Sequence, residues 1–180
     1  MLWSSLSSDH DLLARTTWRA PCVAGRKWVW DAVSFEFLHP REEVPSGRSA
    51  RANNRSCVLR IQAKGGRVLL TGDIERAAER VLLHNAPQLL VAEALVVPHH
   101  GSASSSSPEF VKQVAPRYAI FTAGYRNRFG HPREDVLARY REAGSELLRT
   151  DSGGAIQMRF GPGSVQVEAR RDRARRYWHE

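Results

Sequence analysis

The chain has few cysteines and no long apolar segment, and these absences exclude several classes of protein. Cys22 and Cys57 are its only cysteines, and they lie 35 positions apart without a CxxC spacing. We therefore expect neither a disulfide framework nor a zinc ribbon, and we interpret each cysteine as a small buried apolar residue. The longest apolar run, LLVAEALVV, is interrupted by Glu93 and is much shorter than the about 20 residues that a membrane-spanning helix needs.

Length and composition predict a single globular domain. The chain has 180 residues, of which 42% are hydrophobic and 26% charged, an ordinary balance for a protein with one packed core. The opening residues MLWSSLSSDH lack the basic start and the apolar run of a secretory signal. We therefore expect nothing in this chain to direct export or to insert it into lipid.

The sequence is strongly basic, which favours polyanionic partners. Lysine and arginine number 27 against 19 aspartate and glutamate residues, giving a formal net charge of +8. Neutralising phosphates with such charges releases counterions, and this gives affinity for nucleic acid without sequence preference. The alternative interpretation is that the abundance of arginine only reflects a GC-rich genome.

Alternating strand and helix patterns predict an α/β fold with a mixed sheet. Residues 28–38 alternate apolar and polar side chains, which predicts one half-buried strand, and the polar residues 39–56 predict a long surface loop. The sequence AKGG between two apolar runs predicts a tight hairpin. The rest of the sequence predicts helices at 74–85, 108–115 and 132–143, and strands at 94–97, 118–122, 146–150, 154–160 and 164–170.

Three polar clusters each follow a predicted strand: TGD at 71–73, PHHGS at 98–102 and NRFGHP at 127–132. The carboxyl ends of neighbouring strands meet at one edge of a sheet in α/β folds. We therefore expect four side chains to lie close together there: Asp73, His99, His100 and His131. A carboxylate with imidazoles suits Zn²⁺ or Mn²⁺.

Each cluster also has a structural interpretation. Asp73 precedes a predicted helix and could be its N-cap. His131 stands before a proline and could serve in capping or packing. The adjacent pair His99 and His100 is harder to explain structurally, and Gly101 after it would let the backbone approach closely without a Cβ. Among the other histidines, we interpret His39, His84 and His179 as structural or solvent-exposed and leave His10 open.

The order of the motifs resembles a known family. The runs CVAGRKWVWDAVSFEFLHP, NNRSCVLRI, LLTGDIE, VVPHHGS, SSSPEF, NRFGHP and RTDSGGAI follow one another over roughly residues 20 to 160. This series resembles the carboxyl-terminal metallo-β-lactamase-like domain of ComEC-type competence proteins, the inner-membrane channels for DNA uptake in natural transformation. The resemblance implies the carboxyl-terminal half of a metallo-β-lactamase αββα sandwich, with a mixed sheet and flanking helices.

The resemblance also implies roles for individual residues. Asp73 is similar to the metal-bridging aspartate of that fold, and His99 or His100 to the histidine ligand that follows it. His131 with Asn127 is similar to a rim motif that holds a phosphate or a metal. Asn54 and Ser56 fall in a rim segment where many relatives have a histidine ligand. We place four residues in the catalytic set: His131, Asn127, Asn54 and Ser102.

The HxHxDH motif, the main ligand cluster of that fold, is absent from this sequence. SSDHD at 7–11 offers one histidine and two aspartates in the wrong order. By the family pattern the cluster should lie upstream, so we expect a carboxyl-terminal part of a longer protein and weak metal binding by this part alone. The expected organisation is a poorly defined segment at 1–19, a partial metallo-β-lactamase-like domain at 20–168 and a basic tail at 169–180.

The function implied is phosphodiester hydrolysis by a divalent metal, Zn²⁺ or Mn²⁺, with two ions in the complete domain. The implied substrate is DNA at the uptake channel, single-stranded or duplex, and the implied role is degradation of the strand that is not transported. The other expected partner is the upstream membrane part of the same protein, in the bacterial inner membrane. Two alternatives remain, an inactive remnant that binds DNA or a partner and a free-standing hydrolase of small phosphoesters or esters.

Overall fold

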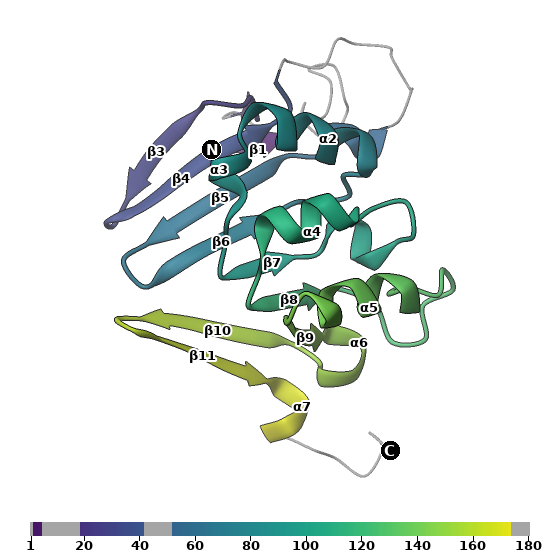
Figure 1. Ribbon diagram of the computed structural model, residues 1–180. Helices are drawn as coiled ribbons and strands as arrows, with labels where there is room; N and C mark the ends of the chain where they lie inside the picture. The colour runs from purple at the N-terminus through teal and green to yellow at the C-terminus, as the bar shows by residue number, and fades with distance from the viewer. Residues whose placement is uncertain (1, 5–18, 42–51, 174–180) are drawn as a thin grey trace.

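A mixed seven-stranded sheet forms the centre of the protein. The computed structural model describes residues 2–4, 19–41 and 52–173. The strand order is β3-β4-β5-β6-β7-β8-β9, antiparallel from β3 to β6 and parallel from β6 to β9 (Figure 1). The strands are β3 (Lys27–Trp30), β4 (Val33–His39), β5 (Val58–Ala63), β6 (Gly66–Leu70), β7 (Ala94–Val96), β8 (Tyr118–Phe121) and β9 (Glu146–Arg149).

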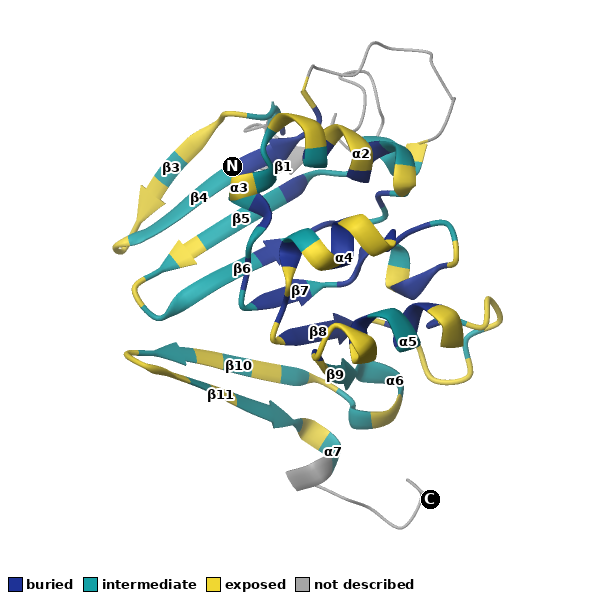
Figure 2. Cartoon of the chain, in the orientation of Figure 1, coloured by how far each residue is buried: buried dark blue, intermediate teal, exposed yellow. Residues whose placement is uncertain are grey.

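Helices cover one face of this sheet. They follow the parallel strands in turn as α2 (Arg76–Asn85), α3 (Pro87–Leu90), α4 (Pro108–Val114) and α5 (Glu134–Glu142). Their apolar side chains, Leu82, Phe110 and Tyr140 among them, pack with Leu69, Leu95 and the rest of that face into the main core. In Figure 2 the residues coloured as buried lie mainly on β7, β8 and the helices that cover them.

A second hairpin packs against the other face of the sheet. It consists of β10 (Ile156–Gly161) and β11 (Ser164–Ala169). Its apolar residues contact Ala94, Tyr118 and Ile120, and so form a smaller core beneath β7 and β8. The structure also has four short helices, η1 (Ala52–Arg55), η2 (Pro98–Gly101), α6 (Thr150–Gly153) and α7 (Arg170–Arg173). Separately, β1 (Leu2–Ser4) pairs in parallel with β2 (Arg19–Pro21).

Most of the elements expected from the sequence are confirmed, including the α/β class and the mixed sheet with flanking helices. The β5–β6 hairpin turns at Lys64 and Gly65, and Ser107 caps α4 by accepting a hydrogen bond from Phe110 N. The expected start of α5 at Pro132 is wrong, because the helix begins at Glu134. Residues 42–51 of the predicted loop, SSDHD, His10, His179 and residues 174–180 of the basic tail lie outside the described residues.

The single strand expected at 28–38 is in fact a hairpin. Asp31 and Ala32 have φ angles of 50° and 60°, and they turn the chain between β3 and β4. Two consecutive residues with positive φ match the right-handed twist of a two-residue hairpin. The alternation continues through the turn and neither turn residue is glycine, so periodicity alone could not reveal it.

The expectation that the cysteines are unpaired is also wrong. Cys22 and Cys57 form a disulfide, with their Cα atoms 5.9 Å apart. Both reach the same end of β4, because Ala24 N donates to Pro40 O and Val58 pairs with His39. The disulfide therefore joins the segment before β3 to the start of β5. Among the described residues, no helix is long and apolar enough to cross a bilayer.

Candidate functional site

The predicted polar clusters meet at the carboxyl edge of the parallel strands. Asp73 follows β6, His99 and His100 follow β7, and His131 lies in the loop after β8. His100 Nε2 lies 3.3 Å from Asp73 Oδ1. The His99 ring lies 6.4 Å from the ring of His100 and 5.8 Å from that of His131, centroid to centroid. We call this group, together with Glu75, the imidazole rim.

A left-handed backbone segment presents the two adjacent histidines. His99, His100 and Gly101 have φ angles of 49°, 56° and 82°, a conformation that costs a non-glycine residue on the order of 1–3 kcal/mol. At Gly101 a Cβ would also lie 2.8 Å from Pro132 Cβ and 2.9 Å from Phe121 Cδ1. The glycine that follows the histidines is therefore required for packing against two neighbouring segments. Backbone strain of this kind is typical of functional sites.

Glu75 is a member of the rim that the sequence analysis missed. Ser104 Oγ donates to Glu75 Oε1 over 3.1 Å and lies 3.3 Å from His99 Nδ1, while the carboxylate itself is 3.6 Å from the same nitrogen. A carboxylate and a hydroxyl thus fix the orientation of this imidazole and leave Nε2 as its other functional nitrogen. The only sequence signal was the position of Glu75 two residues after Asp73.

Asp73 is not the N-cap of α2, so the structural interpretation of this residue fails. The N-cap position belongs to Glu75, and Asp73 N donates instead to Ser56 Oγ over 3.2 Å. Asn54 performs the capping, because its Oδ1 accepts hydrogen bonds from Glu75 N and Ala78 N. Its Nδ2 donates to Glu75 Oε2 over 3.3 Å. Asn54 therefore does not join the imidazole rim directly but holds Glu75 in position.

Asn127 and Ser102 likewise contact the chain that carries the rim. Asn127 Oδ1 accepts from His131 N, and its Nδ2 donates to the oxygens of Gly124 and His131. Ser102 is 8% exposed, and its hydroxyl bonds to the hydroxyl and backbone N–H of Ser104. Their predicted catalytic roles remain predictions, and the contacts that they form hold the two histidine loops in shape.

Positive charge and burial combine at His131. Burial lowers the pKa of its imidazole, and the nearby charges of His99, His100 and Arg133 lower that pKa further. Its Nδ1 is buried and has no hydrogen-bond partner among the described residues. The ring is therefore held in its neutral form, the form that can accept a proton or bind a cation.

Comparison with known proteins shows the family to which the chain belongs. No family model matches the chain. It is 42% identical over 81% of its length to the "Competence protein ComA" of Neisseria gonorrhoeae, and 37% identical over 71% to the "ComE operon protein 3" of Bacillus subtilis. The "Recombination protein 2" of Haemophilus influenzae is 30% identical over 86%. The chain is a relative of the ComEC-type competence proteins.

This ComEC-type chain spans only part of its relatives. It covers 20% of the Neisseria protein, 16% of the Bacillus protein and 19% of the Haemophilus protein. The functions of those whole proteins therefore apply to this chain only as proposals.

The described residues of the ComEC-type chain do not make a complete metal site. Among them, no three histidine, cysteine, aspartate or glutamate side chains are placed to hold one ion. Asp73 and His100 bring two donor atoms together, whereas a structural zinc ion needs four ligands. A metal at the imidazole rim would thus require further ligands from outside the described residues.

The rim of the ComEC-type chain is an open edge that is accessible to a large ligand. The side chains of Asp73 and His100 are 44% and 46% exposed. An open pocket of about 540 Å³ lies elsewhere, in the helical layer, and its lining includes Arg76, Arg80 and Arg139. The described residues therefore leave both of these rim side chains accessible to solvent.

Proposed function

We propose that this chain is a DNA-handling part of a ComEC-type competence protein and that its imidazole rim is one half of a metal-dependent phosphodiesterase site. The observation that carries the proposal is the pairing of Asp73 Oδ1 with His100 Nε2 at 3.3 Å, on an accessible sheet edge next to two more imidazoles. In this proposal the chain has the second half of a metallo-β-lactamase fold, and the site degrades the DNA strand that is not transported.

The names of the relatives and the charge of the chain both support DNA as the substrate. One relative is named a competence protein, one is named for the ComE operon and one is named for recombination. The net charge of +8 favours a phosphate polymer. The Cys22–Cys57 disulfide supports a place of action outside the reducing cytosol, because such bonds persist mainly in oxidising compartments.

Four of the five rim residues have a task that their contacts favour. Asp73 supplies an accessible carboxylate for a Zn²⁺ or Mn²⁺ ion whose remaining ligands come from outside the described residues. Glu75 and Ser104 orient His99 so that Nε2 faces a ligand. Burial lowers the pKa of His131, which favours the neutral imidazole that can offer a lone pair to a cation.

Replacing Asp73 by asparagine tests this proposal. We expect the chain, joined to the upstream half of the fold that the proposal requires, to shorten labelled DNA in millimolar Mn²⁺, and Asp73→Asn to lower that rate roughly 100-fold or more, since a neutral amide is a poor cation ligand. The measurement is the rate of loss of full-length oligonucleotide on a gel. Asp31→Asn is the matched control, because Asp31 is exposed in the distant β3–β4 turn. Cleavage that survives Asp73→Asn, or no cleavage by the joined protein in any divalent metal, would refute the phosphodiesterase.

A second candidate function is a DNA-binding module without catalysis. It is favoured by the absence of a three-residue metal cluster among the described residues. In that case DNA binding would weaken steeply with salt and would be unchanged by Asp73→Asn.

A further inference from the structure

The loop between β8 and α5 exposes two large aromatic rings close to the imidazole rim. We call residues 124–130 the aromatic loop. Tyr125 is 64% exposed and Phe129 is 65% exposed. Single exposed apolar residues are common on protein surfaces, but two aromatic rings in one short loop indicate a binding surface.

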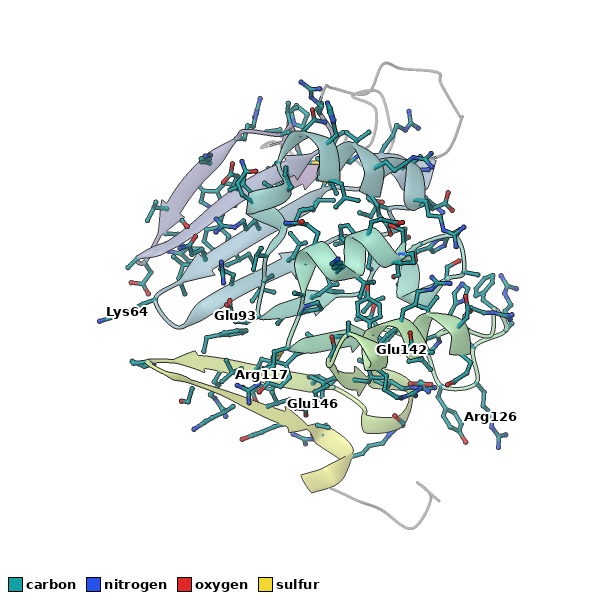
Figure 3. All side chains as sticks on the ribbon, viewed as in Figure 1. Lys64, Glu93, Arg117, Arg126, Glu142 and Glu146 are labelled. Atoms are coloured by element: carbon teal, nitrogen blue, oxygen red, sulfur yellow. A yellow bond between two sulfur atoms is a disulfide. The ribbon has the colours of Figure 1, made fainter. Side chains whose placement is uncertain are left out.

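An arginine accompanies each of these rings. The guanidinium of Arg126 lies 5.2 Å from the centroid of Tyr125, and that of Arg128 lies 5.0 Å from the centroid of Phe129. Neither arginine is ion-paired with a carboxylate among the described residues. Figure 3 shows Arg126 projecting outward at the end of the loop. Each ring therefore has a guanidinium over it and still remains largely exposed, with the positive charge available to a phosphate.

The aromatic loop is held in one shape before any ligand arrives. Asn127 N and Asn127 Nδ2 both donate to Gly124 O, and Gly130 N donates to Asn127 O. Arg171 lies over Tyr125 at 5.9 Å and is itself anchored to the oxygens of Asp151 and Ser152. A loop that is already ordered loses little conformational entropy when it binds, which favours affinity.

A row of rings connects the loop to the rim. Phe129 is stacked on His131, with centroids 6.0 Å apart and planes inclined by 21°. His131 then lies 5.8 Å from His99, whose neighbour His100 contacts Asp73. A strand bound at Phe129 would therefore lie next to the imidazole rim.

We propose that the aromatic loop binds single-stranded DNA, with bases stacked on Tyr125 and Phe129 and the backbone phosphates on Arg126 and Arg128. This inference adds a surface that binds the DNA substrate of the proposed function. It rests on the proposed function only for the claim that the bound strand leads to the imidazole rim. Unpaired bases expose faces that a ring can stack on, whereas a duplex hides these faces in its own stack. The loop thus selects single strands and delivers them to the rim.

The test is the anisotropy of a fluorescein-labelled oligothymidylate bound by the full chain in EDTA, with a duplex of equal length in parallel. The combined Tyr125→Ala and Phe129→Ala variant is expected to bind the single strand roughly 10- to 100-fold more weakly, since each stacked base contributes substantially to affinity. Its duplex affinity is expected to stay within about twofold, because duplex binding depends on charge. Trp30→Ala is the matched control, since Trp30 is 74% exposed at the distant β3–β4 hairpin, and should leave both affinities unchanged.

A second variant separates the charges from the rings. Arg126→Gln with Arg128→Gln should reduce the slope of log affinity against log salt by about 0.7 for each lost phosphate contact. Unchanged single-strand affinity in the aromatic variant, or an equal loss for single strand and duplex, would overturn the inference. EDTA removes divalent metal, so this experiment measures DNA binding without cleavage. A negative result would overturn the binding inference and would not decide whether the chain is part of a phosphodiesterase. Far-UV circular dichroism of each variant confirms that it is folded.

Discussion

Replacing Glu79 by alanine is expected to lower the free energy of unfolding by about 2–5 kcal/mol, since each buried N–H group left without a partner costs about 1–3 kcal/mol. Glu79 is fully buried on α2, and its carboxylate accepts hydrogen bonds from Ser106 N at 2.5 Å and Ser107 N at 2.8 Å. These bonds hold the serine loop that carries Ser104 to the rim. The change would be measured by urea unfolding.

Glu79 should also make the free energy of unfolding depend on pH, and its burial sets the direction of that dependence. Burial raises the pKa of Glu79 above the ordinary value of 4.5, although the bonds from Ser107 and Ser106 act in the opposite direction. The folded chain therefore holds this proton more tightly than the unfolded chain does. The contribution of Glu79 to stability is greatest below about pH 4.5 and is lost as the pH rises through the folded pKa.

Two comparisons isolate this effect. The difference in stability between the native chain and Glu79→Gln should decrease between pH 4 and pH 7, since the glutamine does not titrate. Glu109→Ala, an exposed carboxylate on α4, should change stability by less than about 0.5 kcal/mol. If Glu79→Ala were as stable as Glu109→Ala, the buried carboxylate would not be what holds the serine loop.

Reducing the Cys22–Cys57 disulfide is expected to lower the free energy of unfolding by about 3–4 kcal/mol. The bond closes a loop across a sequence separation of 35 residues, and cross-links of this length restrict the unfolded chain by about that amount. Urea unfolding with and without a reductant measures the loss.

Replacing both cysteines by serine supplies the control. The doubly substituted chain should have the stability of the reduced chain, and reductant should not change it further. Ser56 adjoins Cys57 and accepts a hydrogen bond from Asp73 N, so reduction should also weaken Asp73-dependent cleavage. Equal stability of the oxidised and reduced chains would mean that the cross-link does not constrain this domain.

Local patterns predicted the elements and the edge at which the polar clusters meet. Apolar runs followed by Asp73 and by the histidine pair are short-range signals, and the topology of parallel strands places their carboxyl ends together. The family resemblance added the roles of these residues. The left-handed conformation of His99 and His100 is not visible in the residue types, because it depends on Gly101 packing against Pro132 and Phe121.

The features that sequence analysis missed depend on partners far along the chain. The cysteines could not be paired from their spacing, since their meeting depends on both segments reaching the same end of β4. Glu79 occupies a helical position where a charge is expected to face solvent, but its partners are backbone N–H groups 27 and 28 residues away. Glu75 likewise belongs to the rim through His99 and Ser104, which lie 24 and 29 residues further along the chain.

NMR of the imidazole protons during a Mn²⁺ titration tests most directly whether the imidazole rim is a cation-binding edge. The paramagnetic ion broadens nearby signals even when it binds weakly. We expect His99, His100 and His131 to broaden at the lowest Mn²⁺ concentrations, His84 on the exposed face of α2 to stay sharp, and Asp73→Asn to abolish the selective broadening. Equal broadening of all four histidines, or selective broadening that survives Asp73→Asn, would contradict the assignment of this edge as the functional site.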